Sequence, residues 1–123
     1  MNNTNESNVI YLKKPKRFSL NEAKRILPEV RQMTDQAVEF VEPMVERIQE
    51  SSNPEEQYEL SLEVQQAIDD WTEKIQRLGA VPKGLWLVDF DSGSGYFCWQ
   101  YNEGDLGFFH AYNEGFSNRV PIQ

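Results

Sequence analysis

The sequence has one cysteine, one histidine and no long hydrophobic run among its 123 residues. The single cysteine, Cys98, excludes an internal disulfide and a zinc cluster made of several thiolates. With a single histidine, His110, the sequence lacks the residues that most metal sites and most nucleophilic catalytic sites need. Apolar stretches reach at most five residues, far below the roughly 20 that a membrane-spanning helix needs. We see no apolar signal-peptide core at the N-terminus and expect a cytoplasmic protein without membrane insertion.

Positive charge is scarce in most of the chain, which has 12 Lys and Arg against 20 Asp and Glu and a net charge of −8. Residues 1–17 alone carry a net charge of +3, so the remaining 106 residues carry −11. An acidic body repels phosphate backbones, and we expect no nucleic-acid binding through it. The basic tail, residues 1–17, is expected to be disordered and solvated, with nucleic acid or anionic lipid as the alternative contact.

Apolar residues recur at spacings of three and four through the first two thirds of the chain, which is typical of packed helices. Ser19 and Glu22 have the spacing of a capping box and predict a helix over residues 19–50. A second helix is expected over residues 54–78, ended by Gly79. The short connection predicts an antiparallel helical hairpin with a coiled-coil-like seam.

After Gly79 the apolar period changes to two and the composition becomes aromatic, which predicts strands. The expected strands are Leu85 to Phe90, Tyr96 to Tyr101 and Gly107 to Tyr112. They predict a three-stranded antiparallel meander over residues 85–112, followed by a C-terminal tail. The chain is therefore predicted to be a single α+β domain over residues 18–123.

The turns between the strands predict a register in which Asp89, Phe97 and His110 lie at one level on one face. In that register both faces of the sheet are rich in apolar residues. The helical hairpin can cover one face only, since a solvated face should be polar. We expect the C-terminal tail, a second copy of the chain or a partner to cover the other face.

A set of short motifs runs from residue 18 to residue 122. They are Phe18-Ser19-Leu20-Asn21-Glu22-Ala23, Leu27-Pro28-Glu29-Val30-Arg31, Gly84-Leu85, Val88-Asp89-Phe90, Cys98-Trp99, Phe109-His110 and Gly115-Phe116 with Arg119-Val120-Pro121-Ile122. Together they resemble an uncharacterised bacterial family, domain of unknown function 2203. Two positions depart from it: Asp91 stands where the family tends to have proline, and Ala111 where it tends to have an acidic residue. The resemblance implies a shared scaffold and supplies no reaction.

Four polar residues near the end of the chain form a candidate binding cluster: Asp89, His110, Glu114 and Arg119. An ionisable pair such as Asp89 and His110 on an aromatic face must be paired, hydrated or shifted in pKa. Asp89, His110 and Glu114 are also a candidate ligand set for a divalent metal. The structural alternatives are an Asp89 turn, a His110 bond to a backbone carbonyl, and a salt bridge from Arg119 to Asp89 or Glu114.

Aromatic side chains of the predicted sheet suggest a second candidate site, a binding platform. Its members are Trp86, Phe97, Trp99 and Phe108. The alternative, and the default for such residues, is packing under the helices. Cys98 is interpreted as a buried structural thiol because we expect no basic residue near it, and Glu103 as a solvated turn residue.

The sequence favours a small interaction or structural module that acts as a homodimer. The competing hypothesis is a small-molecule or metal-binding domain, hydrolytic in one version, that uses the candidate binding cluster. If the protein is an interaction or structural module, we expect it not to be an enzyme. We predict no cofactor, and a divalent metal is the alternative. A protein partner other than a second copy remains open.

Overall fold

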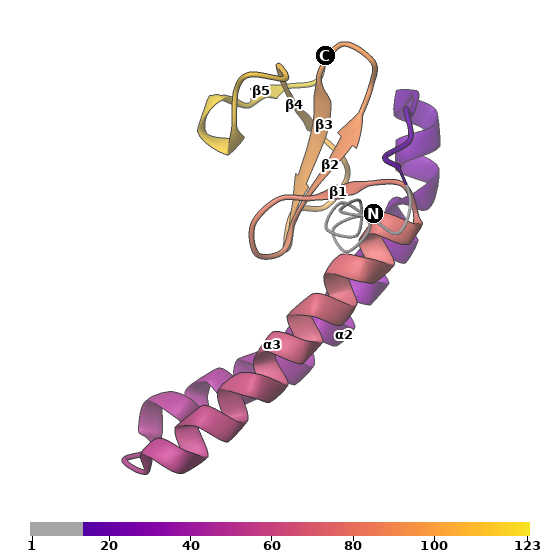
Figure 1. Ribbon diagram of the computed structural model, residues 1–123. Coiled ribbons are helices and arrows are strands. Elements are labelled where there is room, and N and C mark those ends of the chain that lie inside the picture. The colour runs from indigo at the N-terminus through magenta and orange to yellow at the C-terminus, as the bar shows by residue number, and fades with distance from the viewer. Residues whose placement is uncertain (1–13) are drawn as a thin grey trace, which may run out of the picture.

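The computed structural model describes residues 14–123 and consists of a long helical hairpin with a small sheet at one end (Figure 1). The hairpin is made of α2 (Leu20–Glu50) and α3 (Pro54–Arg77). Its turn lies far from the sheet, at the opposite end of an elongated molecule. Residues 1–13 of the predicted basic tail lie outside the described residues. At the end of that tail, Lys16 donates its backbone N–H to the carbonyl of Gly79 and Arg17 forms a bridge with Asp91, so the prediction of a disordered tail was wrong for these two residues. None of the described helices combines the length and the apolar content that a membrane span requires.

Local side-chain chemistry sets both ends of the hairpin helices. Ser19 Oγ accepts from the backbone N–H of Glu22 at 3.1 Å, and Glu22 Oε1 accepts from the N–H of Ser19 at 2.9 Å. This reciprocal capping box satisfies two of the orphan donors at the start of α2. Asn53 Oδ1 accepts from the N–H groups that follow Pro54, and the chain leaves α3 at Gly79 with φ of +89°. The predicted hairpin is confirmed.

A polar residue of α2, Thr34, is fully buried between the helices. Its hydroxyl donates to the carbonyl of Val30 at 2.7 Å and accepts from Trp71 Nε1 at 2.9 Å. The buried hydroxyl and the buried indole N–H therefore both have partners, the first within α2 and the second between the two helices. Trp71 in turn contacts Trp86 edge to face, with ring centroids 5.0 Å apart, and joins the hairpin to the sheet region.

We expect Thr34→Val to lower the free energy of unfolding by about 1–3 kcal/mol, because the Trp71 N–H would stay buried without an acceptor. The matched control is Thr72→Val at a half-buried position of α3, where a change within about 0.5 kcal/mol is expected. Urea denaturation of the two variants measures both effects. Equal effects would contradict the importance of the Thr34–Trp71 bond.

The sheet has five antiparallel strands in chain order, where the sequence predicted three. Their bounds are β1 (Val81–Pro82), β2 (Leu87–Asp91), β3 (Tyr96–Gln100), β4 (Phe108–His110) and β5 (Val120–Pro121). The two added edge strands have two residues each, too few to produce a period-two pattern. The predicted first strand also begins too early, since the backbone turns at Gly84 and Trp86, both with positive φ. The α+β class is confirmed and the strand number was wrong.

The predicted register was wrong by one residue on each side of the central strand. Asp89 pairs with Cys98 and His110 pairs with Tyr96, so neither lies opposite Phe97. Between β2 and β3 the cause is the first turn, because Asp91 still pairs with Tyr96. Between β3 and β4 the connection after β3 also differs by one residue. A shift of one residue moves every side chain of a strand to the other face. The two errors add to a shift of two residues between the outer strands, so Asp89 and His110 still share a face but are not at the same level, and Asp89 lies level with Phe108.

The two faces of the sheet have different roles. Val88, Phe90 and Trp99 point toward the helices and pack into the main core with Leu27 and Ile75. The opposite face carries the side chains at the alternating positions of the same strands. These are Asp89, Asp91, Tyr96, Cys98, Phe108 and His110. The C-terminal segment after β4 covers part of this second face, through contacts described below.

Candidate functional site

Three ionisable side chains meet on the sheet face that points away from the core. Asp89 comes from β2, Cys98 from β3 and His110 from β4, one residue from each of three adjacent strands. One ligand-type atom from each residue lies within 4.8 Å of the other two. Their exposed fractions are 2%, 0% and 4%. We call this group the sheet triad.

His110 is held through both ring nitrogens. Nδ1 lies 2.9 Å from the backbone carbonyl oxygen of Ala111, and Nε2 lies 3.1 Å from Asp89 Oδ2. A carbonyl can only accept, so Nδ1 carries a proton. In a neutral ring, Nε2 is then an acceptor that faces the Asp89 carboxyl group. A hydrogen bond between them therefore needs one further proton, carried either by the imidazole or by the carboxyl group. His110 therefore makes the backbone-carbonyl contact that was the structural alternative and is also paired with Asp89.

Asp89 is a buried carboxyl group with only part of its hydrogen-bonding capacity used. Oδ2 contacts His110, whereas Oδ1 has no hydrogen-bond partner in the part of the chain that the structure describes. Burial raises the pKa of Asp89 above its ordinary value, and the nearby His110 opposes that rise. A buried carboxylate with one bare oxygen costs free energy, and groups of this kind are concentrated at functional sites.

Cys98 lies between the two outer residues of the triad. Burial, followed by the neighbouring Asp89 carboxylate, raises the pKa of the Cys98 thiol to about 12. The thiol is therefore neutral and unreactive as a nucleophile at pH 7. The guanidinium of Arg119 is near it, with Nη1 3.9 Å from Sγ, so the expectation that no basic residue lies near Cys98 was wrong.

Arg119 is fixed by an acidic partner that the sequence did not indicate. Its Nη1 and Nη2 donate to the two carboxylate oxygens of Glu103 at 3.1 and 2.7 Å. The rings of Phe108 and Phe116 lie on the guanidinium, each with a centroid 4.0 Å away. The predicted salt bridge to Asp89 or Glu114 and the predicted solvated Glu103 were wrong. The cause is again the register, which brings the turn after β3 beside the C-terminal segment.

Glu114 lies outside the triad. It is exposed, and its Oε1 accepts from the backbone N–H of Ala111 at 3.4 Å within a local turn. The structure thus brings together Asp89 and His110 of the predicted cluster, places Arg119 at the edge of the same group beside Cys98, and leaves Glu114 apart. The sequence analysis did not include Cys98 in the candidate binding cluster. A correct register would have placed Cys98 on the central strand, on the same face as Asp89 and His110.

The four aromatic residues of the predicted platform do not share one surface. Trp99 is buried in the core, and Phe97 and Trp86 pack against that core. Phe108 lies on the opposite face under Arg119. Three of the four therefore follow the alternative of packing under the helices.

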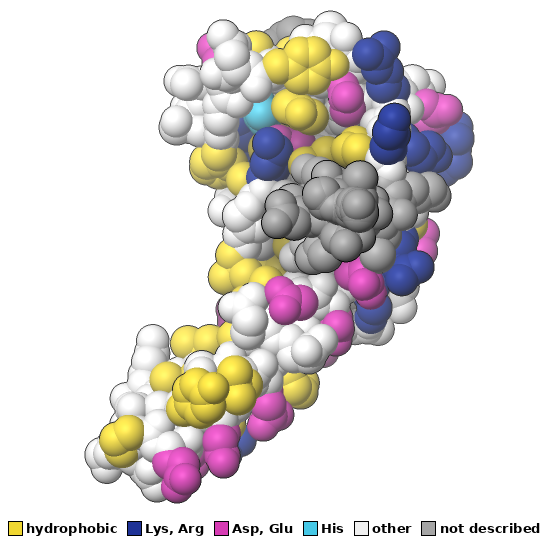
Figure 2. Space-filling model, in the orientation of Figure 1, with side chains coloured by type: hydrophobic (Ala, Val, Ile, Leu, Met, Phe, Trp, Pro, Cys, Tyr) yellow, Lys and Arg dark blue, Asp and Glu magenta, His cyan; other side chains and the backbone are white. Residues whose placement is uncertain are grey.

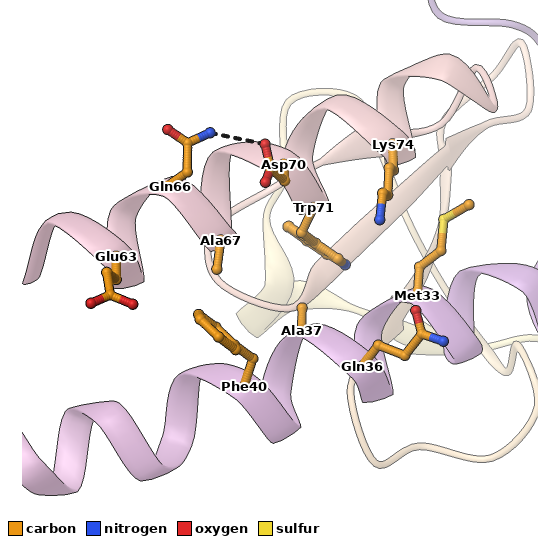
Figure 3. Close-up of a pocket in the computed structure, with 10 residues that line it drawn as sticks. All are labelled: Met33, Gln36, Ala37, Phe40, Glu63, Gln66, Ala67, Asp70, Trp71 and Lys74. Carbon is orange, nitrogen blue, oxygen red and sulfur yellow. Dashed lines mark hydrogen bonds between the residues drawn. The ribbon is translucent and has the colours of Figure 1, made fainter. Parts of the chain in front are cut away.

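A groove lies between the two helices, away from the sheet triad (Figure 3). Its volume is about 370 Å³. Phe40 and Trp71 extend between the helices on its floor, Lys74 reaches across toward α2, and Gln66 donates to Asp70 at the rim. The full lining is Met33, Gln36, Ala37, Phe40, Glu63, Gln66, Ala67, Asp70, Trp71 and Lys74. Such a mainly apolar groove with a polar rim is typical of helix and small-molecule binding surfaces.

Comparison with known proteins gives a family and no activity. No curated protein and no solved structure matches this sequence. The family described as "Uncharacterized conserved protein (DUF2203)" matches residues 16–122. This range includes the whole hairpin, the sheet and the C-terminal segment that carries Arg119. Because the match covers nearly all of the chain, the protein belongs to the DUF2203 family.

Proposed function

We propose that this protein is an interaction module that self-associates through the half of its hairpin that lies far from the sheet. The single observation that carries this proposal is the exposed apolar surface there. Phe40, Tyr58 and Leu62 are exposed to 47%, 64% and 52%. Figure 2 shows hydrophobic side chains gathered on the visible face of that end, with acidic side chains along its edge.

This apolar surface is continuous with the groove along α3. Tyr58, Leu62 and Gln66 follow one another at intervals of four, so they lie on one stripe of the helix. Gln66 lines the groove, and Phe40 from α2 lines it as well. The exposed stripe and the groove therefore form one surface, which we call the hairpin surface. Two-helix hairpins bury little apolar area on their own, and packing against further helices is the common way to cover such a stripe.

A two-fold, antiparallel arrangement of two copies gives this surface a complementary partner. With the axis near Gln66, Leu62 of one copy lies at the level of Trp71 in the other. Glu59 then lies at the level of Lys74, which favours this register, whereas Glu63 lies at the level of Asp70, a like-charge pair that the apolar contacts have to outweigh. A two-fold interface is self-complementary by symmetry, and the product is a four-helix bundle.

The competing hypothesis of a hydrolytic or small-molecule site has less support. Asp89 and His110 are almost fully buried, Arg119 is engaged by Glu103, and Glu114 lies apart. A substrate would have to displace these internal contacts. The hairpin surface needs no such rearrangement.

We expect the wild-type protein to form a reversible dimer in sedimentation equilibrium at micromolar concentration, and Leu62→Glu to weaken the dimer at least tenfold. A charge buried in an apolar interface costs well above the roughly 1.4 kcal/mol that corresponds to tenfold. Leu85→Glu is the matched control, because Leu85 is 55% exposed and lies on the loop before β2. It should leave the dimer constant unchanged.

A wild-type protein that stays monomeric up to about 100 µM, well above the micromolar range of weak specific dimers, would overturn the proposal. Equal weakening by Leu62→Glu and Leu85→Glu would overturn it as well, since it would place the interface elsewhere.

A further inference from the structure

The sheet triad lies outside the hairpin surface proposed for self-association, and its composition is that of a metal-ligand set. It combines a carboxylate, a thiol and an imidazole, each from a different strand, with ligand atoms within 4.8 Å of one another. Strands are more rigid supports than loops, so three ligands on adjacent strands keep their spacing. All three side chains are at least 96% buried. Side chains of this polarity are rarely placed together in a dry interior without a partner.

The orientation of His110 matches that of a metal-bound histidine. Its Nδ1–H donates to the carbonyl of Ala111, which fixes the ring and leaves Nε2 as the coordinating atom. Metal-ligating histidines almost always donate the other ring N–H in this way. Nε2 lies 3.1 Å from Asp89 Oδ2. Two ligands about 2.0–2.1 Å from a tetrahedral ion are about 3.3 Å apart, so the pair is already close to the required separation.

The carboxyl group of Asp89 supplies an independent observation. Its Oδ1 is buried and has no hydrogen-bond partner among residues 14–123. The residue is 2% exposed, so bulk water cannot readily satisfy that oxygen. A cation among the three side chains would satisfy it and would offset the charge of a buried carboxylate.

We propose that Asp89, Cys98 and His110 bind a thiophilic divalent metal ion, with Zn²⁺ as the best match. Sulfur and imidazole nitrogen are ligands that zinc prefers, and zinc accepts a carboxylate oxygen in the same shell. Mg²⁺ and Ca²⁺ require mostly oxygen ligands and do not suit a site with a thiol and an imidazole. On binding, the Cys98 proton is released to solvent and the sulfur coordinates as thiolate. One carboxylate and one thiolate then balance the two positive charges of the ion inside the sheet.

Arg119 supports the thiolate from the outside. Its Nη1 is already 3.9 Å from Cys98 Sγ and its other contacts hold it in place. A hydrogen bond from a fixed guanidinium to a ligating sulfur is the kind of outer contact that orients metal ligands. Three protein ligands leave a fourth position for water or an added ligand, as in open zinc sites.

The test is titration of untagged, chelator-treated protein with Co²⁺ and then with Zn²⁺. Cobalt bound by a thiolate shows a sulfur-to-metal charge-transfer band, and tetrahedral cobalt shows strong visible bands. Because the chain has one cysteine and one histidine, a thiolate band assigns the ion to Cys98. We expect one Co²⁺ per chain, displaced by one Zn²⁺, and a rise of several degrees in the unfolding temperature with excess Zn²⁺.

Variants then identify the other ligands. Cys98→Ser should abolish the thiolate band, and Asp89→Asn and His110→Gln should each weaken Zn²⁺ binding more than about 100-fold, beyond the 10–100-fold typical of outer contacts. Glu114→Gln is the control and should bind as wild type, because Glu114 lies outside the triad. Circular dichroism checks that each variant is folded.

Absence of a thiolate–cobalt band in folded wild-type protein overturns the proposal, whatever the variants do. Binding that survives in Cys98→Ser, or that is lost equally in Glu114→Gln, overturns it too. In these cases the triad is a proton-sharing structural pair beside a buried thiol. The self-association proposed for the hairpin surface does not depend on either result, so the two proposals fail independently.

Discussion

Arg119→Ala is expected to lower the free energy of unfolding by about 2–3 kcal/mol. The substitution removes two charge-assisted hydrogen bonds to Glu103 and the packing of Phe108 and Phe116 on the guanidinium. The side chains of Arg119 and Glu103 are only 10% and 22% exposed. Breaking a fully buried pair costs about 3–5 kcal/mol, and an exposed one about 0–1 kcal/mol, so this pair lies between.

The effect should be concentrated in the C-terminal segment. Arg119 directly precedes β5, which pairs with β4, and the N–H of Ile122 donates to the carbonyl of Gly107 at 2.8 Å. Hydrogen exchange in the Arg119→Ala variant should therefore show faster exchange at the β5–β4 pairing than in α2 or α3. Arg119→Lys keeps the charge and loses the bidentate geometry, and is expected to recover less than half of the loss.

Arg47→Ala is the matched control for this prediction. Arg47 pairs with Glu56 at 3.8 Å, but their side chains are 59% and 46% exposed. A pair of this kind contributes less than about 1 kcal/mol. If guanidinium denaturation gives equal losses for Arg47→Ala and Arg119→Ala, the Arg119 contacts do not stabilise the C-terminal segment.

Asp89→Asn is expected to raise the free energy of unfolding of the metal-free protein at pH 7 by about 1–2 kcal/mol. The amide has nearly the same shape, and its N–H can donate to His110 Nε2, so the 3.1 Å contact no longer depends on a proton shared between the imidazole and the carboxyl group. The variant avoids burying a carboxylate, whose removal from water is costly. The same variant loses the stabilisation by Zn²⁺, because the amide is a poor ligand.

The pH dependence of this gain follows from the direction of the shift. Burial raises the pKa of Asp89 above 3.8, and His110, Cys98 and Lys83 modify that rise. The folded protein therefore holds the Asp89 proton to higher pH than the unfolded chain does. The stability linked to that proton is complete below about pH 3.8 and is lost as the pH rises through the folded-state pKa. The advantage of Asp89→Asn should be absent near pH 3.5, below the ordinary aspartate pKa, and should grow toward neutral pH.

Asp91→Asn is the control on the same strand and face. Its Oδ1 accepts from the N–H of Gly93 and from the hydroxyl of Tyr112, so the carboxylate is well used. This substitution should be neutral or destabilising. Urea denaturation in the presence of chelator measures both variants. If Asp89→Asn lowers the free energy of unfolding as Asp91→Asn does, the Asp89 carboxylate stabilises the metal-free fold and the prediction is wrong.

The hairpin could be predicted because its information is local. The capping box of Ser19 and Glu22, the Asn53–Pro54 start and the Gly79 stop lie within a few residues of the groups that they satisfy. The three-and-four spacing indicates the buried face directly, with Thr34 as a polar residue on it. Its partner, Trp71, is 37 residues away, so the hydrogen bond itself required the packed helices.

The sheet could be predicted as a class and not as a geometry. Alternation and glycine turns indicate strands, but the register depends on where each turn begins, and Asp91 belongs to β2. That single residue decides which face Cys98 occupies. The edge strands depend on pairing alone, because two residues such as Val120 and Pro121 have no pattern of their own.

The sequence by itself determined the helical hairpin, the change to strands after Gly79, the acidic body and the choice of Asp89 and His110 as notable residues. Each of these depends on residue type and on spacing over one or two turns. The tertiary structure alone decided that Cys98 joins Asp89 and His110, that Arg119 pairs with Glu103 and that Glu114 stays apart. The physical reason is that these contacts join strands and turns whose relative position follows from long-range pairing, which one-residue shifts reverse.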